Sequence, residues 1–133
     1  MANTKIHFVL VGIKTDQFAL LDTKMSEKKK VDFNSNIQFR LNTNDRRIGV
    51  FSNFEYVQGK NVFIKLAVSC HFEIAEDAWN DFLKDNQFIV PVGFARHLSM
   101  LTVGTARGIL HCKTEGTPYN AFLLPTINVT EMV

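Results

Sequence analysis

The chain has 133 residues, 46% of them hydrophobic and 21% charged, which is enough apolar material for a single packed domain over residues 1–133. Its 15 basic and 13 acidic side chains leave a formal net charge of +2, so composition argues against a nucleic-acid partner. The N-terminus has no basic segment that leads into a long apolar one, and no stretch approaches the length of a membrane span, so we expect a cytoplasmic protein that does not insert into a membrane.

Residues 5–21 combine β-branched and aromatic residues on both sides of a polar break at residues 14–17. This pattern predicts a strand that bends or carries a bulge at the break. Residues 24–30 are dominated by lysine and other polar residues, which indicates a solvated loop between strands. A contact patch for an anionic partner is the alternative.

The middle of the chain has a period of two. Apolar and polar residues alternate over residues 31–41, which predicts a half-buried antiparallel strand with one face in water. The alternation resumes over residues 48–56 and 62–72, and turn-forming residues separate the three segments at 42–45 and 58–61. We therefore predict a meander of three long strands, joined by the first strand into one four-stranded antiparallel sheet.

Residues 73–88 change to a helical period. Apolar residues recur at the spacing of one helical face, and acidic residues are concentrated in the N-terminal half, where the helix dipole stabilises them. A short amphipathic helix is therefore predicted. Its apolar face would consist of Ala75, Trp79, Phe82 and Leu83.

A long helix is predicted from Pro91, which suits a first helical turn, to about Lys113. Because few of its residues are charged and many are small, it lacks the polar face of a surface helix and should be covered on two sides, by the sheet and by a second subunit. Gly104 and Gly108 would permit close approach of that subunit, although glycine has other uses at such positions. The predicted fold class is α+β: the four-stranded antiparallel meander packed with this long helix in the C-terminal third and the short amphipathic helix.

Residues 117–129 follow the long helix and are bracketed by two prolines. They are too apolar for an ordinary solvated loop, so we expect them to lie against another part of the protein. No internal repeat, low-complexity tract or domain linker is recognisable in the sequence.

Residue types that carry catalysis or bind metals are present, but they lack the required spacing. Cys70 and Cys112 each have an adjacent histidine but not the paired spacing of a zinc site, and we expect free, mostly buried thiols. Cys112 follows His111 directly, yet neighbouring helical residues point in different directions, so a thiol nucleophile with its base is not expected. The acidic residues between positions 73 and 85 have the spacing of the wet side of a helix, and no phosphate-binding loop is present. We therefore predict a protein that is not an enzyme, with no catalytic residues, no metal and no cofactor.

Three segments of the sequence resemble the SecB family of protein-export chaperones. The triplet Phe-Ala-Arg at residues 94–96 opens a long helix after a sheet, and Pro-Thr-Ile-Asn-Val at residues 125–129 closes an apolar, proline-bracketed segment. Lys-Thr-Asp-Gln-Phe at residues 14–18 is similar to the family's first strand, in which a Lys and Asp pair precedes a Phe. With the meander between them, the resemblance covers most of residues 6–129.

The resemblance implies a SecB-like fold and a dimer of dimers in which the long helices lie between two sheet layers. It also implies a groove that holds unfolded polypeptides or preproteins by apolar contact, which asks little of the client's sequence. The residues that would line this groove are Tyr119, Phe122, Leu123 and Leu124. The residues that would form the oligomer interface are Phe94, Leu101, Gly104 and Gly108. The alternative is that the first set only seals the core of the oligomer.

Some features depart from the SecB pattern. The sequence ends at Val133, before the family's second helix and its basic, metal-binding tail, which contacts the SecA motor. Lys65 occupies a strand position at which many family members have an acidic residue on the SecA-binding face. Gly93 replaces a common proline, and the interval from Pro118 to Pro125 is one residue longer than usual. These departures argue against a SecA contact.

Three hypotheses for function remain. The first is a SecB-like oligomer that keeps clients unfolded without chemistry, with protein export as one use. The second is a dedicated interaction module of the same fold that serves one partner, such as an antitoxin or an outer-membrane assembly factor. The third is a hotdog-like thioester hydrolase, which also wraps a sheet around a long apolar helix. In hotdog proteins, however, that helix precedes most strands, and here no well-placed acidic residue lies at its start.

Overall fold

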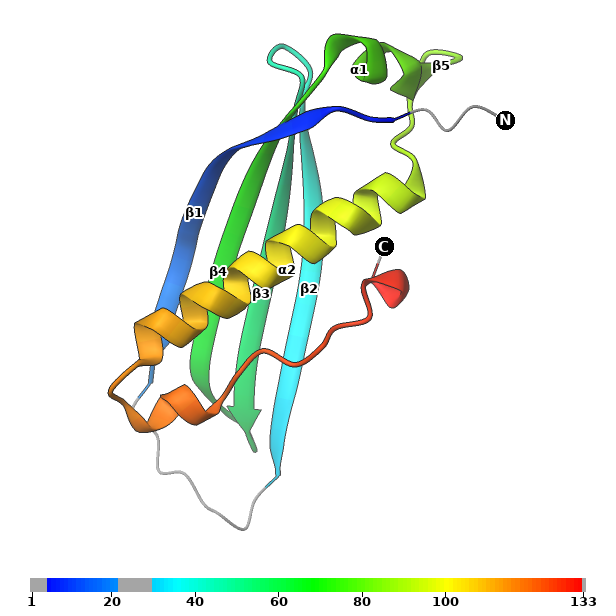
Figure 1. Ribbon diagram of the computed structural model, residues 1–133. Helices are drawn as coiled ribbons and strands as arrows, with labels where there is room; N and C mark the ends of the chain where they lie inside the picture. The colour runs from blue at the N-terminus through cyan, green and yellow to red at the C-terminus, as the bar shows by residue number, and fades with distance from the viewer. Residues whose placement is uncertain (1–4, 22–29, 133) are drawn as a thin grey trace.

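The computed structural model describes residues 5–21 and 30–132. Their sheet has the order β1-β4-β3-β2 and is antiparallel throughout, so β2, β3 and β4 form the predicted meander, β1 pairs with β4, and β1 and β2 are the edge strands (Figure 1). This α+β fold with a four-stranded antiparallel sheet confirms the prediction. The strands are β1 (Phe8–Leu20), β2 (Val31–Asn42), β3 (Arg47–Gln58) and β4 (Asn61–Ile74).

β1 contains the irregularity that its polar break predicted. Its register with β4 shifts between Thr15 and Gln17, inside the break, and also between Leu10 and Gly12. Such shifts bend a strand and increase its twist, and β1 accordingly curves along the edge of the sheet (Figure 1). The lysine-rich loop predicted at residues 24–30 lies almost wholly outside the described residues.

Two tight turns connect the meander. Gln58 pairs with Asn61, so the turn from β3 to β4 has two central residues, and Gly59 adopts a φ of 65°, which favours glycine. In the turn from β2 to β3, the side chain of Asn42 accepts a hydrogen bond from the backbone N–H of Asp45 at 3.2 Å. The turn-forming residues of the sequence therefore make the turns expected of them.

The helix predicted over residues 73–88 is wrong in its length. α1 covers only Glu76–Phe82, and β5 (Leu83–Lys84) and β6 (Gln87–Phe88) follow it as a small hairpin (Figure 1). Leu83 is consequently exposed and does not join the buried face of α1.

The chain after α1 makes a tight turn between β5 and β6. Asp85 and Asn86, at the tip of the hairpin, have φ angles of 51° and 62°. A two-residue hairpin turn of type I′ requires positive φ angles at both central residues, and Asn and Asp tolerate them better than most residues. Phe88 then packs against Trp79 of α1, with ring centroids 4.5 Å apart. The hairpin thus folds back on α1 and brings the Phe88 ring against Trp79.

α2 (Val92–Thr114) agrees closely with the predicted long helix and crosses one face of the sheet diagonally (Figure 1). Hydroxyl groups on its buried side donate to carbonyl groups one turn earlier, from Ser99 to Ala95 and from Thr102 to Leu98, both at 2.8 Å. Because these donors are satisfied within the helix, polar residues can be buried against the sheet. Neither α2 nor any other helix among the described residues is long and apolar enough to cross a membrane.

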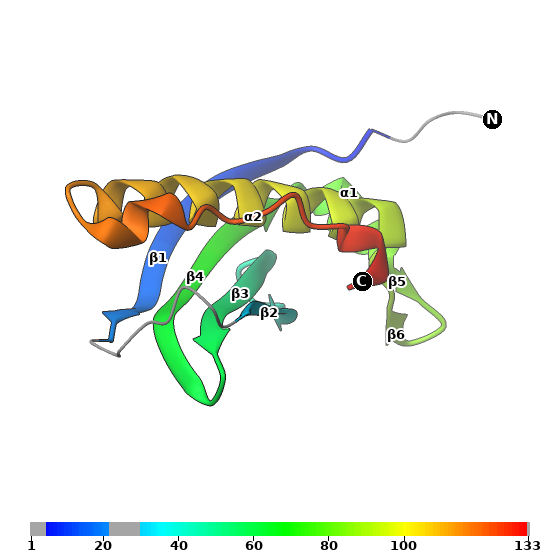
Figure 2. The ribbon, with the colours of Figure 1, turned by 90° about the horizontal axis from the view of Figure 1, so that it is seen from below.

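The chain after α2 reverses at the short 3-10 helix η1 (Pro118–Ala121) and returns along α2 as an extended segment that ends in η2 (Val129–Glu131). We call residues 122–132 the strap. α2 and the strap form one layer over the sheet (Figure 2). Leu124 and Val129 of the strap are buried, which confirms the expectation that this apolar stretch lies against another part of the protein.

Two apolar clusters make up the core, and both lie on the side of the sheet that α2 covers. The first joins the strap to β3, β4 and the C-terminal half of α2, around Phe54, Phe63 and Leu110. The second joins α1 and the N-terminal half of α2 to the other ends of β3 and β4, around Phe72 and Leu98. No described element covers the opposite face of the sheet (Figure 2).

Candidate functional site

The four residues predicted to line a groove lie in or near the strap, but they differ in exposure. Leu124 is 3% exposed and belongs to the core, whereas Leu123 is 55% exposed. The rings of Tyr119 and Phe122 are half-buried and lie beside Phe63, with centroid distances of 6.4 Å and 5.0 Å. Three of the four therefore fill the space between α2 and the sheet instead of lining an open groove, and a client-binding role for the set stays a prediction.

Tyr56 and Arg107 hold the strap by its backbone. Arg107 donates from Nε to the carbonyl oxygen of Leu124 at 3.0 Å and from Nη2 to that of Pro125 at 2.9 Å. The Tyr56 hydroxyl donates to the carbonyl oxygen of Leu123. Burial raises the pKa of Tyr56, and the nearby positive charge of Arg107 opposes that rise. We call Tyr56 and Arg107 the carbonyl clamp, because together they hold three successive carbonyl groups.

The residues predicted at an oligomer interface divide into two groups. Phe94 is 8% exposed and packs in the core against Phe8, with ring centroids 5.4 Å apart, so it has little surface left for a second copy. Leu101 is 40% exposed, and nothing lies within 4 Å of a Cβ atom placed on Gly104 or Gly108. Phe94, which was expected at the interface, thus lies in the core, whereas Leu101, Gly104 and Gly108 lie on the surface.

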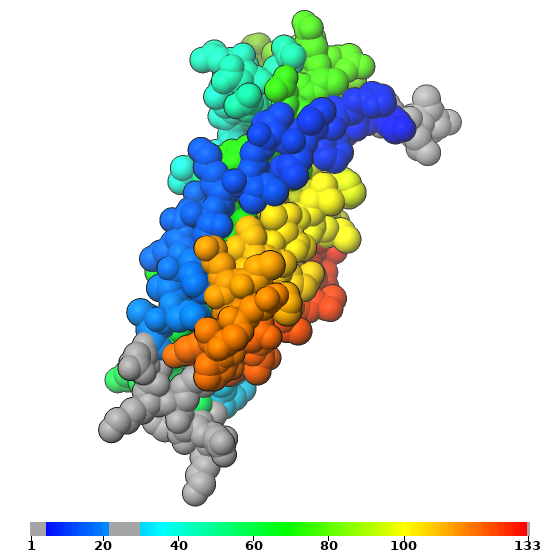
Figure 3. All heavy atoms as spheres, turned by 60° about the vertical axis from the view of Figure 1, so that its left-hand side comes forward, coloured from blue at the N-terminus to red at the C-terminus, as the bar shows by residue number. Residues whose placement is uncertain are grey.

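These three residues belong to an exposed, uncharged face of α2. Met100 extends this face and is 60% exposed, while Leu10 and Ile13 of β1 are exposed as well. Figure 3 shows β1 and α2 side by side on this face of the molecule. A second copy that covers it stays a prediction. We call the helical part the outer stripe, which consists of Met100, Leu101, Gly104 and Gly108.

An open apolar cleft lies between the end of β2 and the start of α2. Its volume is about 310 Å³, and the residues that line it are all apolar. Leu41 and Val92 are exposed there, so the cleft offers free apolar surface to a ligand. We call it the β2–α2 cleft. Its lining consists of Phe39, Leu41, Ile48, Val90, Val92, Ala95 and Leu98.

The sequence did not predict this cleft. Pro91, which lies between two of its lining residues, was assigned only a role in starting α2. The available signal was the apolar pair that flanks this proline, Val90 and Val92. An apolar residue before a helix cannot be assigned to a core or to a surface until its neighbours in space are known. The cleft depends on where β2 ends relative to α2, and this is a tertiary feature.

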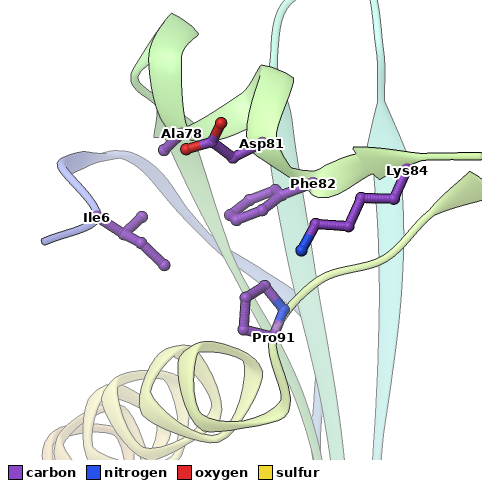
Figure 4. Close-up of a pocket in the computed structure, with 6 residues that line it drawn as sticks. All are labelled: Ile6, Ala78, Asp81, Phe82, Lys84 and Pro91. Carbon is purple, nitrogen blue, oxygen red and sulfur yellow. The ribbon is translucent and has the colours of Figure 1, made fainter. Parts of the chain in front are cut away.

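A second cleft, of about 390 Å³, lies between α1, the hairpin and the start of α2. Figure 4 shows the apolar side chains of Ile6, Phe82 and Pro91 around this space, with Lys84 reaching over it and Asp81 at its rim. The two charged groups make this cleft amphipathic. It is therefore less suited to an apolar chain segment than the β2–α2 cleft.

Metal-binding groups and cysteine thiols do not cluster among the described residues. The described residues include no group of three or more His, Cys, Asp or Glu side chains that could hold a metal ion. Both cysteines are free thiols; Cys70 is buried as expected, whereas Cys112 is exposed. Burial raises the pKa of the Cys70 thiol, and hydrogen bonds with Thr102 and Thr105 partly offset this rise. A thiol that burial keeps protonated is a poor nucleophile.

Comparisons with known proteins give a fold. No protein-family model and no curated protein sequence matches this chain. The structure is similar to that of a SecB-like chaperone from Mycobacterium tuberculosis in complex with a ChAD peptide from an antitoxin, with a TM-score of 0.57 and 10% identity over 91% of each chain. A protein of unknown function from Streptococcus agalactiae has a TM-score of 0.42 and 10% identity over 94% of this chain and 99% of that chain. At 10% identity the first likeness shows the fold alone, and this chain has the α+β fold of a SecB-like chaperone.

Proposed function

We propose that this protein is a non-enzymatic chaperone that binds extended, apolar stretches of other polypeptides. The observation that carries the proposal is the β2–α2 cleft, which is apolar, open and next to an edge strand of the described sheet. An extended polypeptide beside an edge strand can pair with its free backbone groups while its side chains enter an adjoining pocket. Apolar contact adds affinity without requiring a particular client sequence.

The fold neighbour supports this class of ligand. The SecB-like chaperone from Mycobacterium tuberculosis was solved with a bound peptide. A shared fold alone leaves function open, because unrelated functions use the same folds. A shared fold together with an open apolar cleft on this chain favours polypeptide binding over catalysis.

One cleft is too small for tight binding. Burying one Leu or Phe side chain contributes about 1.5–3 kcal/mol, whereas a micromolar dissociation constant requires about 8 kcal/mol. A client must therefore bury several side chains, and an oligomer that presents several clefts to one client raises the overall affinity. We accordingly include in the proposal a cytoplasmic homo-oligomer, a dimer of dimers, that holds unfolded polypeptides or preproteins, with protein export as one use.

Aggregation of a reduced, chemically denatured client protein tests the proposal. Wild-type protein should suppress the light scattering of the diluted client without ATP. Val92→Asp places a charge at the cleft, which apolar client side chains do not compensate, so about tenfold more protein should be needed for the same suppression. Leu83→Asp is the matched control, because Leu83 is also exposed but does not line the cleft. No suppression by the wild type, or equal effects of the two substitutions, would contradict the proposal.

A second candidate function is service to a single partner. The observation that favours it is the antitoxin peptide bound to the fold neighbour. A dedicated module would co-purify with one stoichiometric polypeptide and would bind denatured clients weakly. Mass spectrometry of the protein isolated from its own cells separates the two functions: one stoichiometric partner favours the dedicated module, and many substoichiometric polypeptides favour the general chaperone.

A further inference from the structure

The strap and the β2–α2 cleft occupy two parts of one groove. The strap runs antiparallel to α2: Arg107 contacts its first residues, and Arg96, about three turns earlier in the helix, donates to the carbonyl oxygen of Thr130 at 3.4 Å. The β2–α2 cleft begins at this end of α2, where Ala95 lines it. Ile37 of β2 packs against both core clusters and so connects the two parts. One part of the groove is therefore filled by the strap and the other is open.

The strap lies in this groove as an extended polypeptide. From Arg107 back to Arg96 the helix rises about 17 Å. On the strap, four extended steps from Leu124 to Asn128 cover about 13 Å, and two steps in η2, to Thr130, add about 4 Å. The two distances agree, so the strap follows the helix without looping out. Its apolar side chains pack into the first core cluster: Phe122, Leu124, Ile127 and Val129.

The carbonyl clamp contacts backbone atoms of the strap. The oxygen atoms that accept from Tyr56 and Arg107 belong to three successive residues, 123–125. Every polypeptide carries backbone carbonyl groups, and backbone recognition of this kind leaves specificity to the side-chain pockets. The clamp can therefore hold another chain that has a similar apolar pattern.

The strap is attached without joining the sheet. Within the described residues, the backbone-to-backbone hydrogen bonds of residues 122–132 reach only the strap itself and η1. The bonds from α2 and β3 to the strap are made by side chains, namely those of Arg96, Arg107 and Tyr56. Displacing the strap would therefore break no backbone pairing between the strands of the sheet.

We propose that the strap is a built-in competitor for client polypeptides. An extended, apolar client segment enters through the β2–α2 cleft, displaces the strap and takes its place on the carbonyl clamp. This inference rests on the proposed function, since it names where and how a client binds beyond the cleft. Because the groove is competent only while the strap is displaced, the apparent affinity for a client falls with the fraction of molecules in that state. The strap also covers apolar surface that would otherwise promote aggregation.

The first test measures the binding of one probe to variants of the full chain. The probe is a fluorescent synthetic peptide with the sequence of residues 121–129, Ala-Phe-Leu-Leu-Pro-Thr-Ile-Asn-Val, and fluorescence anisotropy gives its affinity. The double variant Ile127→Ser with Val129→Ser loses apolar strap contacts, so it should bind the probe about tenfold more tightly than the wild type. Leu123→Ser is the matched control on the same strap; because Leu123 is exposed, probe affinity should stay at the wild-type level.

A second variant distinguishes displacement of the strap from a general loss of stability of the fold. Arg107→Gln removes clamp bonds from the strap and from the probe alike, so probe affinity should not rise as it does in the double variant. Hydrogen exchange of the hydrogen-bonded strap amides, those of Phe122, Glu131 and Met132, should become faster in the wild-type protein when the probe is added. This last measurement does not depend on the folding of any variant.

Equal probe affinity in the double variant and the wild type, together with unchanged exchange of the strap amides, would overturn the inference. The denatured-client assay distinguishes this result from failure of the proposed function. If the wild type suppresses aggregation and Val92→Asp weakens it, the proposed function stands while the strap inference falls. If the wild type binds neither the probe nor a denatured client, both fall.

Discussion

Gly49 lies at a crowded point of the uncovered sheet face. A Cβ atom at this position would lie 2.8 Å from Cε2 of Phe51 and 3.2 Å from Nδ1 of His71. The rings of Phe51 and His71 pack edge to face with centroids 5.5 Å apart, and the guanidinium carbon of Arg40 lies 4.5 Å from the centroid of the Phe51 ring. Gly49 has no positive φ, so lack of space is the reason for glycine here.

Gly49→Ala is expected to destabilise the fold by about 1–3 kcal/mol, because the new methyl group must displace a packed ring. Gly12→Ala is the matched control: Gly12 also faces His71, but a Cβ there would have its nearest contact at 3.8 Å. Urea unfolding followed by the fluorescence of the single tryptophan, Trp79, measures both variants. Equal stability of the Gly49→Ala and Gly12→Ala proteins would contradict this prediction, because it would show that the Phe51 and His71 rings can shift without a cost in stability.

Leu123 and Leu124 illustrate what sequence reasoning missed at the scale of single residues. Both are apolar and lie in a segment that needs cover, so the sequence placed both in one groove. In an extended backbone, however, successive side chains point to opposite sides. One of two neighbours on the strap then faces the core while the other faces away, and the structure buries Leu124. In this orientation the carbonyl clamp holds the carbonyl groups of both leucines.

Among the elements, β2 and α2 were predicted to within one residue at each end. β2 has a long alternating pattern that only Ser35 interrupts. α2 follows Pro91 and ends before Gly116 and Pro118, residues that mark the start and the end of a helix. The helix predicted over residues 73–88 failed because a short run of apolar residues fits a helix and also a helix followed by a hairpin. The packing of Phe88 on Trp79, which the sequence does not reveal, accompanies the second arrangement.

The hairpin between β5 and β6 can be tested at its turn. Asn86→Gly should stabilise the protein by about 0.5–1 kcal/mol, because glycine adopts the φ of 62° without steric cost. Gln87→Gly, one residue later in β6, should destabilise it, because glycine weakens a strand. Thermal unfolding reported by Trp79, whose ring packs on Phe88, compares the two. Destabilisation by both substitutions to a similar extent would favour the longer helix that the sequence predicted.

At the scale of the whole molecule, the outer stripe leads to a prediction about assembly. We expect the wild type to form a homo-oligomer and Leu101→Glu to weaken subunit association about a hundredfold, because a carboxylate buried in an apolar contact loses its hydration without a partner. Asn36→Glu is the control, since it adds the same charge at an exposed position of β2. Multi-angle light scattering over a range of concentrations measures the mass. A wild type that stays monomeric at every concentration would contradict the prediction.

The sequence by itself determined the meander, the long helix and the α+β class, because the alternation of the strands and the proline start and low charge of the helix are features that each segment carries within itself. The apolar composition of residues 117–129 also showed that this segment must pack against another part of the protein. Only the tertiary structure decided what provides that cover and which apolar surface stays open. The carbonyl clamp joins β3 to α2, and the β2–α2 cleft joins β2, β3 and α2. Such sites depend on the relative placement of residues far apart in the chain, which no local pattern records.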